Sequence, residues 1–273
     1  TDPVAADIVH GLQSVGMSST FTLDQVFEMG QIEIYENIEE VADIEVTLEK
    51  VIDGYELIFN LATDGKCEDS LVTASKERSD VYLAIFDDGL SHATGVPRNV
   101  CMNSGLFVSS VSYNYSVDGS ATESVTLVGN DRFWNTAHGV LHQTPLTAWG
   151  TDNISVNVNG TDTPLSGVVR RTDVDLSAST LPAEIKTNGG DDGGDNNFHV
   201  QSIAVSTDLG QENIQELGRF GPYTRYATFP IEVTCEFEVI ATSGDLISVS
   251  GNAPNLVDRQ IVIKDTAGTV INL

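Results

Sequence analysis

The stretch Ile44-Glu45-Val46-Thr47-Leu48-Glu49 alternates apolar and polar side chains without interruption. Successive side chains of a β-strand point to opposite faces of the sheet, so this pattern predicts a strand with one apolar and one acidic face. A second copy, Ile231-Glu232-Val233-Thr234-Cys235-Glu236-Phe237-Glu238, lies near the other end of the chain. The polar faces of the two predicted strands carry Glu45, Thr47 and Glu49 in the first copy and Glu232, Thr234, Glu236 and Glu238 in the second.

The two stretches belong to a longer internal repeat. Leu12–Val15 aligns with Val200–Ile203, and at the same spacing Glu28-Met29-Gly30 aligns with Glu216-Leu217-Gly218. Each half, about 8–63 and about 198–250, is predicted to form a strand, a short helical turn that closes at a glycine, and a pair of strands. We expect the halves to pack about a pseudo-twofold axis. Chance similarity between β-rich segments is the alternative.

The composition is that of a folded and strongly acidic protein. Of the 273 residues 40% are hydrophobic, which suffices for a packed core, and we treat residues 1–273 as a single domain. The chain has 40 acidic and 13 basic residues, and its formal net charge is −27. Such a surface repels phosphates and anionic headgroups, so adhesion to nucleic acid or to a membrane surface is not expected.

The cysteines and the apolar runs exclude further classes of protein. Cys67, Cys101 and Cys235 are far apart and form no CxxC pair, so neither a disulfide framework nor a zinc site is predicted. The longest compact apolar run, Val81–Phe86, is too short to span a bilayer, and the first residues lack the pattern of a signal peptide. A soluble protein made in a reducing cytoplasm is expected.

Several further elements are predicted between the two copies. Apolar residues at a spacing near 3.6 favour a helix over Ile52–Thr63, although Gly54 lies within it. Val81–Phe86 reads as a buried strand. A hairpin is predicted from the alternating segments Leu106–Ser116 and Thr122–Val128, which flank the turn residues Asp118 and Gly119.

The remaining segments are less regular. Region 129–199 is rich in Thr, Asn, Gly and Asp and includes the predicted flexible loop Asn188–Asn197. Short strands are predicted at Leu246–Val249, Gln260–Lys264 and Val270–Ile271, the last two within a C-terminal extension, 251–273.

No catalytic motif is present, so we predict that the protein is not an enzyme and has no cofactor. His138 and His142 have helical metal-ligand spacing, but Gly139 replaces the glutamate of a zincin, which favours loop or packing histidines. The run Asp191–Asp195 has oxygen ligands for calcium but lacks the glutamate that closes an EF-hand loop, so a solvated loop is favoured and no metal is predicted. The strand glutamates could form a glycosidase-like pair, yet the alternation is equally typical of any exposed sheet face.

Three blocks of the sequence, together about half of the chain, are similar to one known protein family. They are Gln13–Phe21 with Leu23–Glu36, Tyr113–Asn130, and Glu216–Tyr223 with Phe229–Thr234. On these blocks the sequence resembles the tail tube proteins of long-tailed bacteriophages. None of the blocks is a catalytic signature, and region 129–199 is not covered by the resemblance.

The resemblance implies a β-sandwich or barrel subunit with a flanking helix and long loops. Six copies would close into a ring, and stacked rings would form the tube through which DNA leaves the capsid. The protein would then be part of the virion tail, assembled in the host cytoplasm, with itself as main partner, sheath or other tail proteins as further partners, and DNA only as passing cargo.

The resemblance also assigns roles to residues. It implies that the polar faces of the two repeated strands line the channel, where their carboxylates repel DNA phosphates. Solvation of an ordinary sheet face is the alternative. Arg219 and Arg225 are candidates for pairing with carboxylates of a neighbouring subunit, and Ala62–Asp80 is a candidate contact between rings.

Two other functions compete with a tube. One is a different virion part built on the same fold, such as a baseplate hub or a tail terminator. The other is an acidic, calcium-dependent adhesin or carbohydrate-binding module, suggested by the all-β character and the Gly-Asp loop.

Overall fold

The structure is a computed structural model that describes residues 6–30, 34–63, 71–89, 97–135, 156–157, 167–175, 198–241, 262–265 and 270–272. The described residues are mainly β, with 60% in strands and 5% in helices, and form several antiparallel sheets, as predicted. The elements are β1 (Ala6–Asp7), β2 (Leu12–Thr20), β3 (Leu23–Phe27), β4 (Ile34–Glu39), β5 (Asp43–Val51), α1 (Ile58–Thr63), α2 (Leu71–Ala74), β6 (Ser79–Ile85), β7 (Asn99–Ser116), β8 (Thr122–Gly129), β9 (Asp131–Asn135), β10 (Val156–Asn157), β11 (Phe198–Asp208), β12 (Gln211–Ile214), β13 (Thr224–Ala227), β14 (Val233–Ala241), β15 (Val262–Lys264) and β16 (Val270–Asn272).

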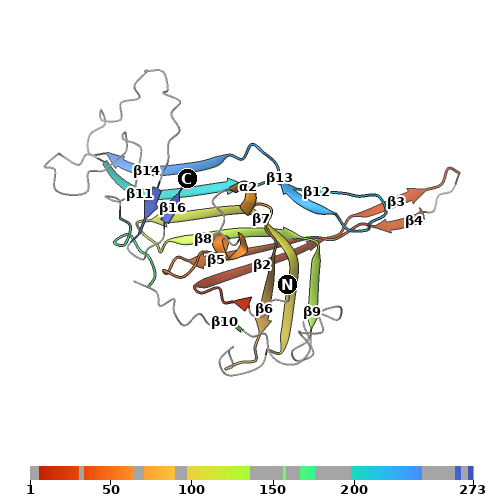
Figure 1. The fold of residues 1–273 in the computed structure, drawn as a ribbon, viewed down its shortest axis with the longest axis horizontal. Coiled ribbons are helices and arrows are strands. Elements are labelled where there is room, and N and C mark those ends of the chain that lie inside the picture. Colours follow the sequence, from red (N-terminus) through yellow and green to blue (C-terminus); the bar gives the residue numbers. More distant parts are fainter. Residues whose placement is uncertain are drawn as a thin grey trace, which may run out of the picture.

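The body of the molecule is built on one antiparallel sheet with the strand order β14-β11-β7-β8-β5-β2 (Figure 1). The repeated stretches are both strands of this sheet, as predicted. Strand β5 is an inner strand, with Val46 opposite Met17 of β2 on one side and Leu127 of β8 on the other. Strand β14 forms one edge of the sheet and pairs only with β11.

The predicted hairpin is strands β7 and β8, which extend further than expected. The first part of β7 pairs with β6 and β9, so the hairpin bends out of the main sheet near Gly105 and Gly129. Gly105 has a φ of +64° at the bend. A Cβ on Gly129 would lie 2.6 Å from Cδ2 of Leu106, so any larger residue there would require the Leu106 side chain to move.

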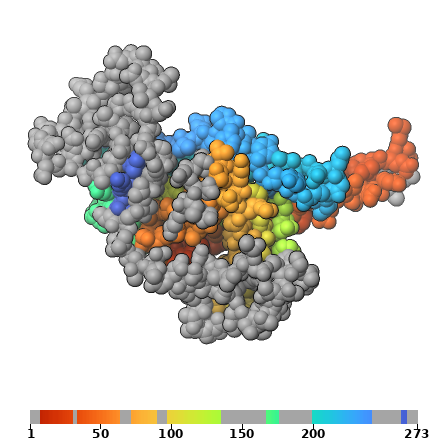
Figure 2. All heavy atoms as spheres, in the orientation of Figure 1, coloured from red at the N-terminus to blue at the C-terminus, as the bar shows by residue number. Residues whose placement is uncertain are grey.

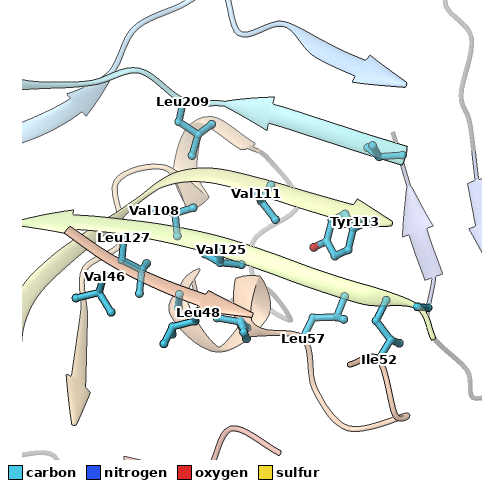
Figure 3. Close-up of a cluster of buried hydrophobic side chains, with 14 of the residues drawn as sticks. Val46, Leu48, Ile52, Leu57, Val108, Val111, Tyr113, Val125, Leu127 and Leu209 are labelled. Atoms are coloured by element: carbon cyan, nitrogen blue, oxygen red, sulfur yellow. The ribbon is translucent and has the colours of Figure 1, made fainter. Parts of the chain in front are cut away.

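The core lies on one face of the main sheet (Figure 3). The buried residues of β5 are Ile44, Val46 and Leu48, the alternate positions that the pattern predicted to be apolar and inward. They pack with Val125 and Leu127 of β8 in one cluster that also includes Leu57 and Ile58 at the start of α1. Burial of a Val, Leu or Ile side chain contributes about 1.5–3 kcal/mol, so this face holds the elements together.

The predicted helix over Ile52–Thr63 is wrong in its first half. Gly54 has a φ of +81°, and the backbone N–H of Tyr55 donates to Asp53 Oδ1 at 3.2 Å, which makes a turn of this segment. Helix α1 begins only at Ile58. The strand predicted at Val81–Phe86 is confirmed as β6 but is half-buried rather than buried, because β6 pairs only with β7.

The helical turns predicted in both repeats are wrong. Each is a β-hairpin, β3–β4 in the first half and β12–β13 in the second, and Gly30 and Gly218 occupy the turns with φ of +96° and +87°. A glycine with positive φ suits a β-turn as well as a helix end, so the sequence signal was ambiguous.

Both halves thus share the order long strand, hairpin, long strand, but the predicted pseudo-twofold relation is wrong. Across the main sheet the order is β14-β11 and, further along, β5-β2. In both halves, the long strand that comes later in the chain therefore lies on the same side of the earlier one. The strands of each half also run in the same direction and turn the same face to the core. One half therefore follows the other along the sheet.

Some predictions fall outside the described residues, namely Leu246–Val249, the loop Asn188–Asn197 and most of 129–199. At the C-terminus, the strands predicted at Gln260–Lys264 and Val270–Ile271 are confirmed as β15 and β16, which pair with each other.

A buried polar cluster fixes the position of α1. The Glu123 carboxylate accepts hydrogen bonds from the backbone N–H groups of Ile58 at 2.6 Å and Phe59 at 3.1 Å, and from the Tyr113 hydroxyl at 3.3 Å. Lys50, the cross-strand neighbour of Glu123, is also fully buried and donates to the carbonyl of Glu56 at 2.8 Å. Burial raises the pKa of Glu123, although its hydrogen bonds to the backbone and the charge of Lys50 act in the opposite direction.

We expect Glu123→Gln to remove part of the pH dependence of folding. Because the folded-state pKa of Glu123 lies above the ordinary value of about 4.3, the native state holds this proton more tightly than the unfolded state. The stabilisation that comes from binding this proton is complete below the pKa of Glu123 in the unfolded state. It is lost as pH rises through the pKa of Glu123 in the folded state. The stability of the wild type relative to the variant should therefore fall over this window, by about 1.4 kcal/mol per unit of pKa shift.

Urea unfolding of both proteins at a series of pH values measures this difference. Glu49→Gln is the matched control, because Glu49 lies on the same sheet but is exposed on its other face. Parallel stability curves for the wild type and Glu123→Gln would contradict the account.

Candidate functional site

The face of the main sheet opposite the core carries mostly polar side chains, with Val128 and Phe107 on it near the start of β5. The strand register aligns its side chains in rows across the sheet, and the members of each row share one face. One row contains only small hydroxyl side chains and one carboxylate: Ser14, Glu49, Ser124, Ser112, Ser206 and Thr234. The next row towards the β5 start contains Gly16, Thr47, Thr126, Ser110 and Asp208. No basic side chain lies in either row.

The acidic residues on this face form two groups. Glu45 and Glu49 lie on β5, whereas Glu236 and Glu238 lie on β14, four strands away. At about 4.8 Å between strands the two groups are about 19 Å apart. The strands between them present Ser, Thr and Asn to the same face, as at Ser112, Asn114 and Ser124.

The two groups are held in the same way. In the first half, the Ser14 hydroxyl on β2 donates to Glu49 Oε2 at 3.1 Å, and in the second half the Ser202 hydroxyl on β11 donates to Glu238 Oε2 at 3.2 Å. Ser14 and Ser202 are equivalent in the internal repeat. Each glutamate is thus oriented along the sheet surface while its side chain stays exposed to solvent.

The structure places nearly all of the predicted strand residues on this face. Glu45, Thr47 and Glu49 share it with Thr234, Glu236 and Glu238, while Glu232 is exposed just before β14 begins. Sequence reasoning missed the hydroxyl rows between them. Their signal was present, because Ser110, Ser112, Ser124 and Thr126 alternate with apolar residues in the predicted hairpin.

The two edges of the main sheet complement each other. Every pair from β14 to β2 is antiparallel, so the edge strands β2 and β14 run in opposite directions. Within the described residues neither edge has a second strand partner. The outer edge of β2 can therefore pair antiparallel with the outer edge of β14 in another copy.

The two arginine candidates have different environments. Arg219 is exposed, lies 3.7 Å from Glu216, and stacks over the Tyr223 ring at 5.6 Å. Arg225 is only 8% exposed and binds within its own chain, donating to Asp43 Oδ1 at 3.0 Å and to the carbonyl of Gly129 at 3.3 Å. Its contacts tie β13 to the start of β5, so of the two arginines only Arg219 has its charge exposed to solvent.

Other chemistry has little support in the described part of the chain. No group of three or more His, Cys, Asp and Glu residues there has the geometry of a metal site. His138, His142 and the run Asp191–Asp195 lie outside the described residues, as do Cys67 and the rest of residues 64–70 in the predicted loop Ala62–Asp80. Among the described helices, none is long and apolar enough to cross a membrane.

The chain matches no protein-family model and no curated protein in sequence. The geometry of the polar face and of the sheet edges therefore carries the functional conclusion.

Proposed function

We propose that the protein is a structural subunit that assembles into rings, and that the rings stack into a tail tube with a negatively charged channel. One observation supports this most strongly. The main sheet has one polar face, whose two rows described above carry no basic side chain, and two edges that can pair with each other in neighbouring copies.

Ring closure follows from the edges. When β2 of one copy pairs with β14 of the next, the antiparallel order continues without a break, and the contact uses two different surfaces of the subunit. Such a head-to-tail contact closes into a ring when its rotation suits, and closure removes the exposed edges that would otherwise invite aggregation. The resemblance to tail tube proteins suggests six copies.

The channel surface follows from the faces. The apolar face of the main sheet packs against α1 and forms the core, so the polar face is the one left to line a channel. Hydroxyl groups and carboxylates without basic residues offer no attraction to phosphates, so a nucleic acid could pass without adhering. On this account Glu45, Thr47, Glu49, Glu232, Thr234, Glu236 and Glu238 repeat around the channel, DNA is cargo, and sheath or other tail proteins are external partners.

We expect assembly to require salt. Each copy carries a net charge of −27, and neighbours in a ring repel one another until ions screen them. The screening length falls from about 10 Å at 0.1 M to about 3 Å at 1 M salt. Raising NaCl over this range should convert monomers into rings and tubes, as seen by light scattering and negative-stain electron microscopy.

Chelation is the control for a calcium-dependent module. EDTA should leave both the assembly and the thermal stability unchanged if the protein is a tube subunit. A protein that stays monomeric at all salt concentrations, or that loses stability with EDTA, would rule out the proposed function.

We expect Glu49→Lys with Glu236→Lys to make the channel retain DNA. The two substitutions place basic side chains on the polar face of every copy, where they bind phosphates. Tubes formed at high salt are cross-linked, transferred to about 0.1 M salt and mixed with short duplex DNA, and nuclease protection of the bound DNA is then measured.

The matched control changes the same charge elsewhere. Asp88→Lys with Asp118→Lys alters two exposed turn residues away from the polar face. Protected DNA is expected only for the Glu49 and Glu236 variant, whereas equal protection in both variants would place the polar face outside the channel.

A further inference from the structure

The hairpin β3–β4 projects from the body of the molecule as an arm (Figures 1 and 2). In the described ranges no hydrogen bond or ion pair joins Leu23–Glu39 to the body. The arm nevertheless carries many large apolar side chains that are exposed: Phe21, Leu23, Val26, Phe27, Met29, Ile34, Tyr35 and Ile38. So many exposed apolar residues on a two-stranded hairpin mark a contact surface.

The repeat shows what such a hairpin does when it has a partner. The equivalent hairpin, β12–β13, is bound to the body of its own chain: Gln211 donates to the carbonyl of Val108 at 2.9 Å, and Arg225 binds Asp43 and Gly129. These partners belong to β7, β8 and β5, the next strands along the sheet after β14 and β11. The arm follows β5 and β2, after which the chain's own sheet ends.

In the proposed ring, the strands that come after β2 across the continuous sheet belong to the next copy. Thr20 at the end of β2 and Val233 at the start of β14 lie at the same end of the main sheet, because every strand pair is antiparallel. An arm that leaves β2 therefore emerges beside the segment Leu209–Val233 of a copy whose β14 pairs with that β2.

That segment offers a complementary surface. Its exposed apolar side chains are Ile214, Leu217, Phe220, Tyr223, Tyr226 and Phe229. Between this segment and the base of the chain's own arm lies a groove of about 610 Å³, whose lining includes Arg78, Arg219, Phe220 and Tyr223 together with Phe21, Glu39 and Glu40. Residues 21–42 contain several acidic residues and no Lys, Arg or His. Within residues 214–229, Arg225 is held by Asp43 of its own chain, whereas Arg219 is exposed, 3.7 Å from Glu216. Because the chain has only 13 basic residues, Arg219 is the charge of this segment that can attract an acidic arm.

We propose that the β3–β4 arm of one copy packs on the segment Ile214–Phe229 of the next copy, with the acidic and apolar tip around Phe27 and Met29 against Leu217, Arg219 and Phe220. This inference deepens the proposed function, since it names the surfaces that join neighbouring copies. The contact is heterologous: each copy gives an arm on one side and receives one on the other, as a ring requires.

Two variants test the contact, and we call them capping variants because each lacks one of the two contact surfaces and would therefore end a row of subunits. Phe27→Asp with Met29→Asp disables the arm, and Leu217→Asp with Phe220→Asp disables the receiving segment. All four side chains are exposed, Met29 and Leu217 fully, so neither variant should disturb the fold of the monomer. Each variant alone should need about 100-fold more protein than the wild type to assemble at high salt, because buried aromatic and aliphatic contacts are replaced by charges.

Mixing the variants distinguishes the arrangement. The arm variant retains an intact receiving segment and the other variant an intact arm, so an equimolar mixture should form a discrete heterodimer and nothing larger. Sedimentation velocity measures this, and circular dichroism confirms folding. Ile85→Asp, an exposed apolar residue on β6, is the matched control and should assemble like the wild type.

Each outcome is decisive. If the wild type assembles and both capping variants do too, the arm contact is excluded while the tube remains. If only the arm variant fails and the mixture forms no heterodimer, two arms pair with each other instead. If a variant misfolds, hydrogen exchange decides in the wild type: the amides of the arm should be protected in the assembly relative to the monomer, and lack of protection excludes the contact. A wild type that never assembles rejects the proposed function itself.

Discussion

Alternation in register across six strands is the constraint on which the rest of the structure depends. Val46 is buried between Met17 and Leu127, while its neighbours Glu45 and Thr47 belong to the polar rows. Because side chains alternate with a period of two, a slip of one residue in a strand would bury its polar side chains, which in β5 are carboxylates, and expose its core residues. The same pattern thus fixes the register, the core and the polar face together.

Two features of the single chain, its sheet edges and its exposed arm, support the proposed assembly. Within the described residues the edges β2 and β14 have backbone groups without strand partners, and the β3–β4 arm leaves apolar side chains in solvent. In the proposed ring a second copy across the edge would cover both, since the arm and the β12–β13 segment start from the same end of the sheet. The high negative charge opposes that contact, which makes salt a condition of assembly rather than of folding alone.

Local sequence patterns predicted the strands. The features that were not predicted depend on contacts between residues that are far apart in the sequence. Strand β5 and the β7–β8 hairpin follow from alternation and from the Asp118-Gly119 turn. The start of α1 depends instead on Glu123, 65 residues away from Ile58, and Arg225 binds Asp43 across 182 residues. The acidic residues of the polar face were predicted, but their union into one surface depends on a strand order that no local pattern contains.

Hydrogen exchange at the two edge strands tests the central claim, that the sheet continues from copy to copy, most directly. In the monomer the outward amides of Leu12–Thr20 and Val233–Ala241 have no strand partner among the described residues, so they should exchange rapidly, whereas amides of the inner strand β8 should be protected. In the assembled state the account predicts that exchange at both edges slows on the order of 100-fold, with β8 unchanged. Equal exchange at β2 and β14 in monomer and assembly would contradict it.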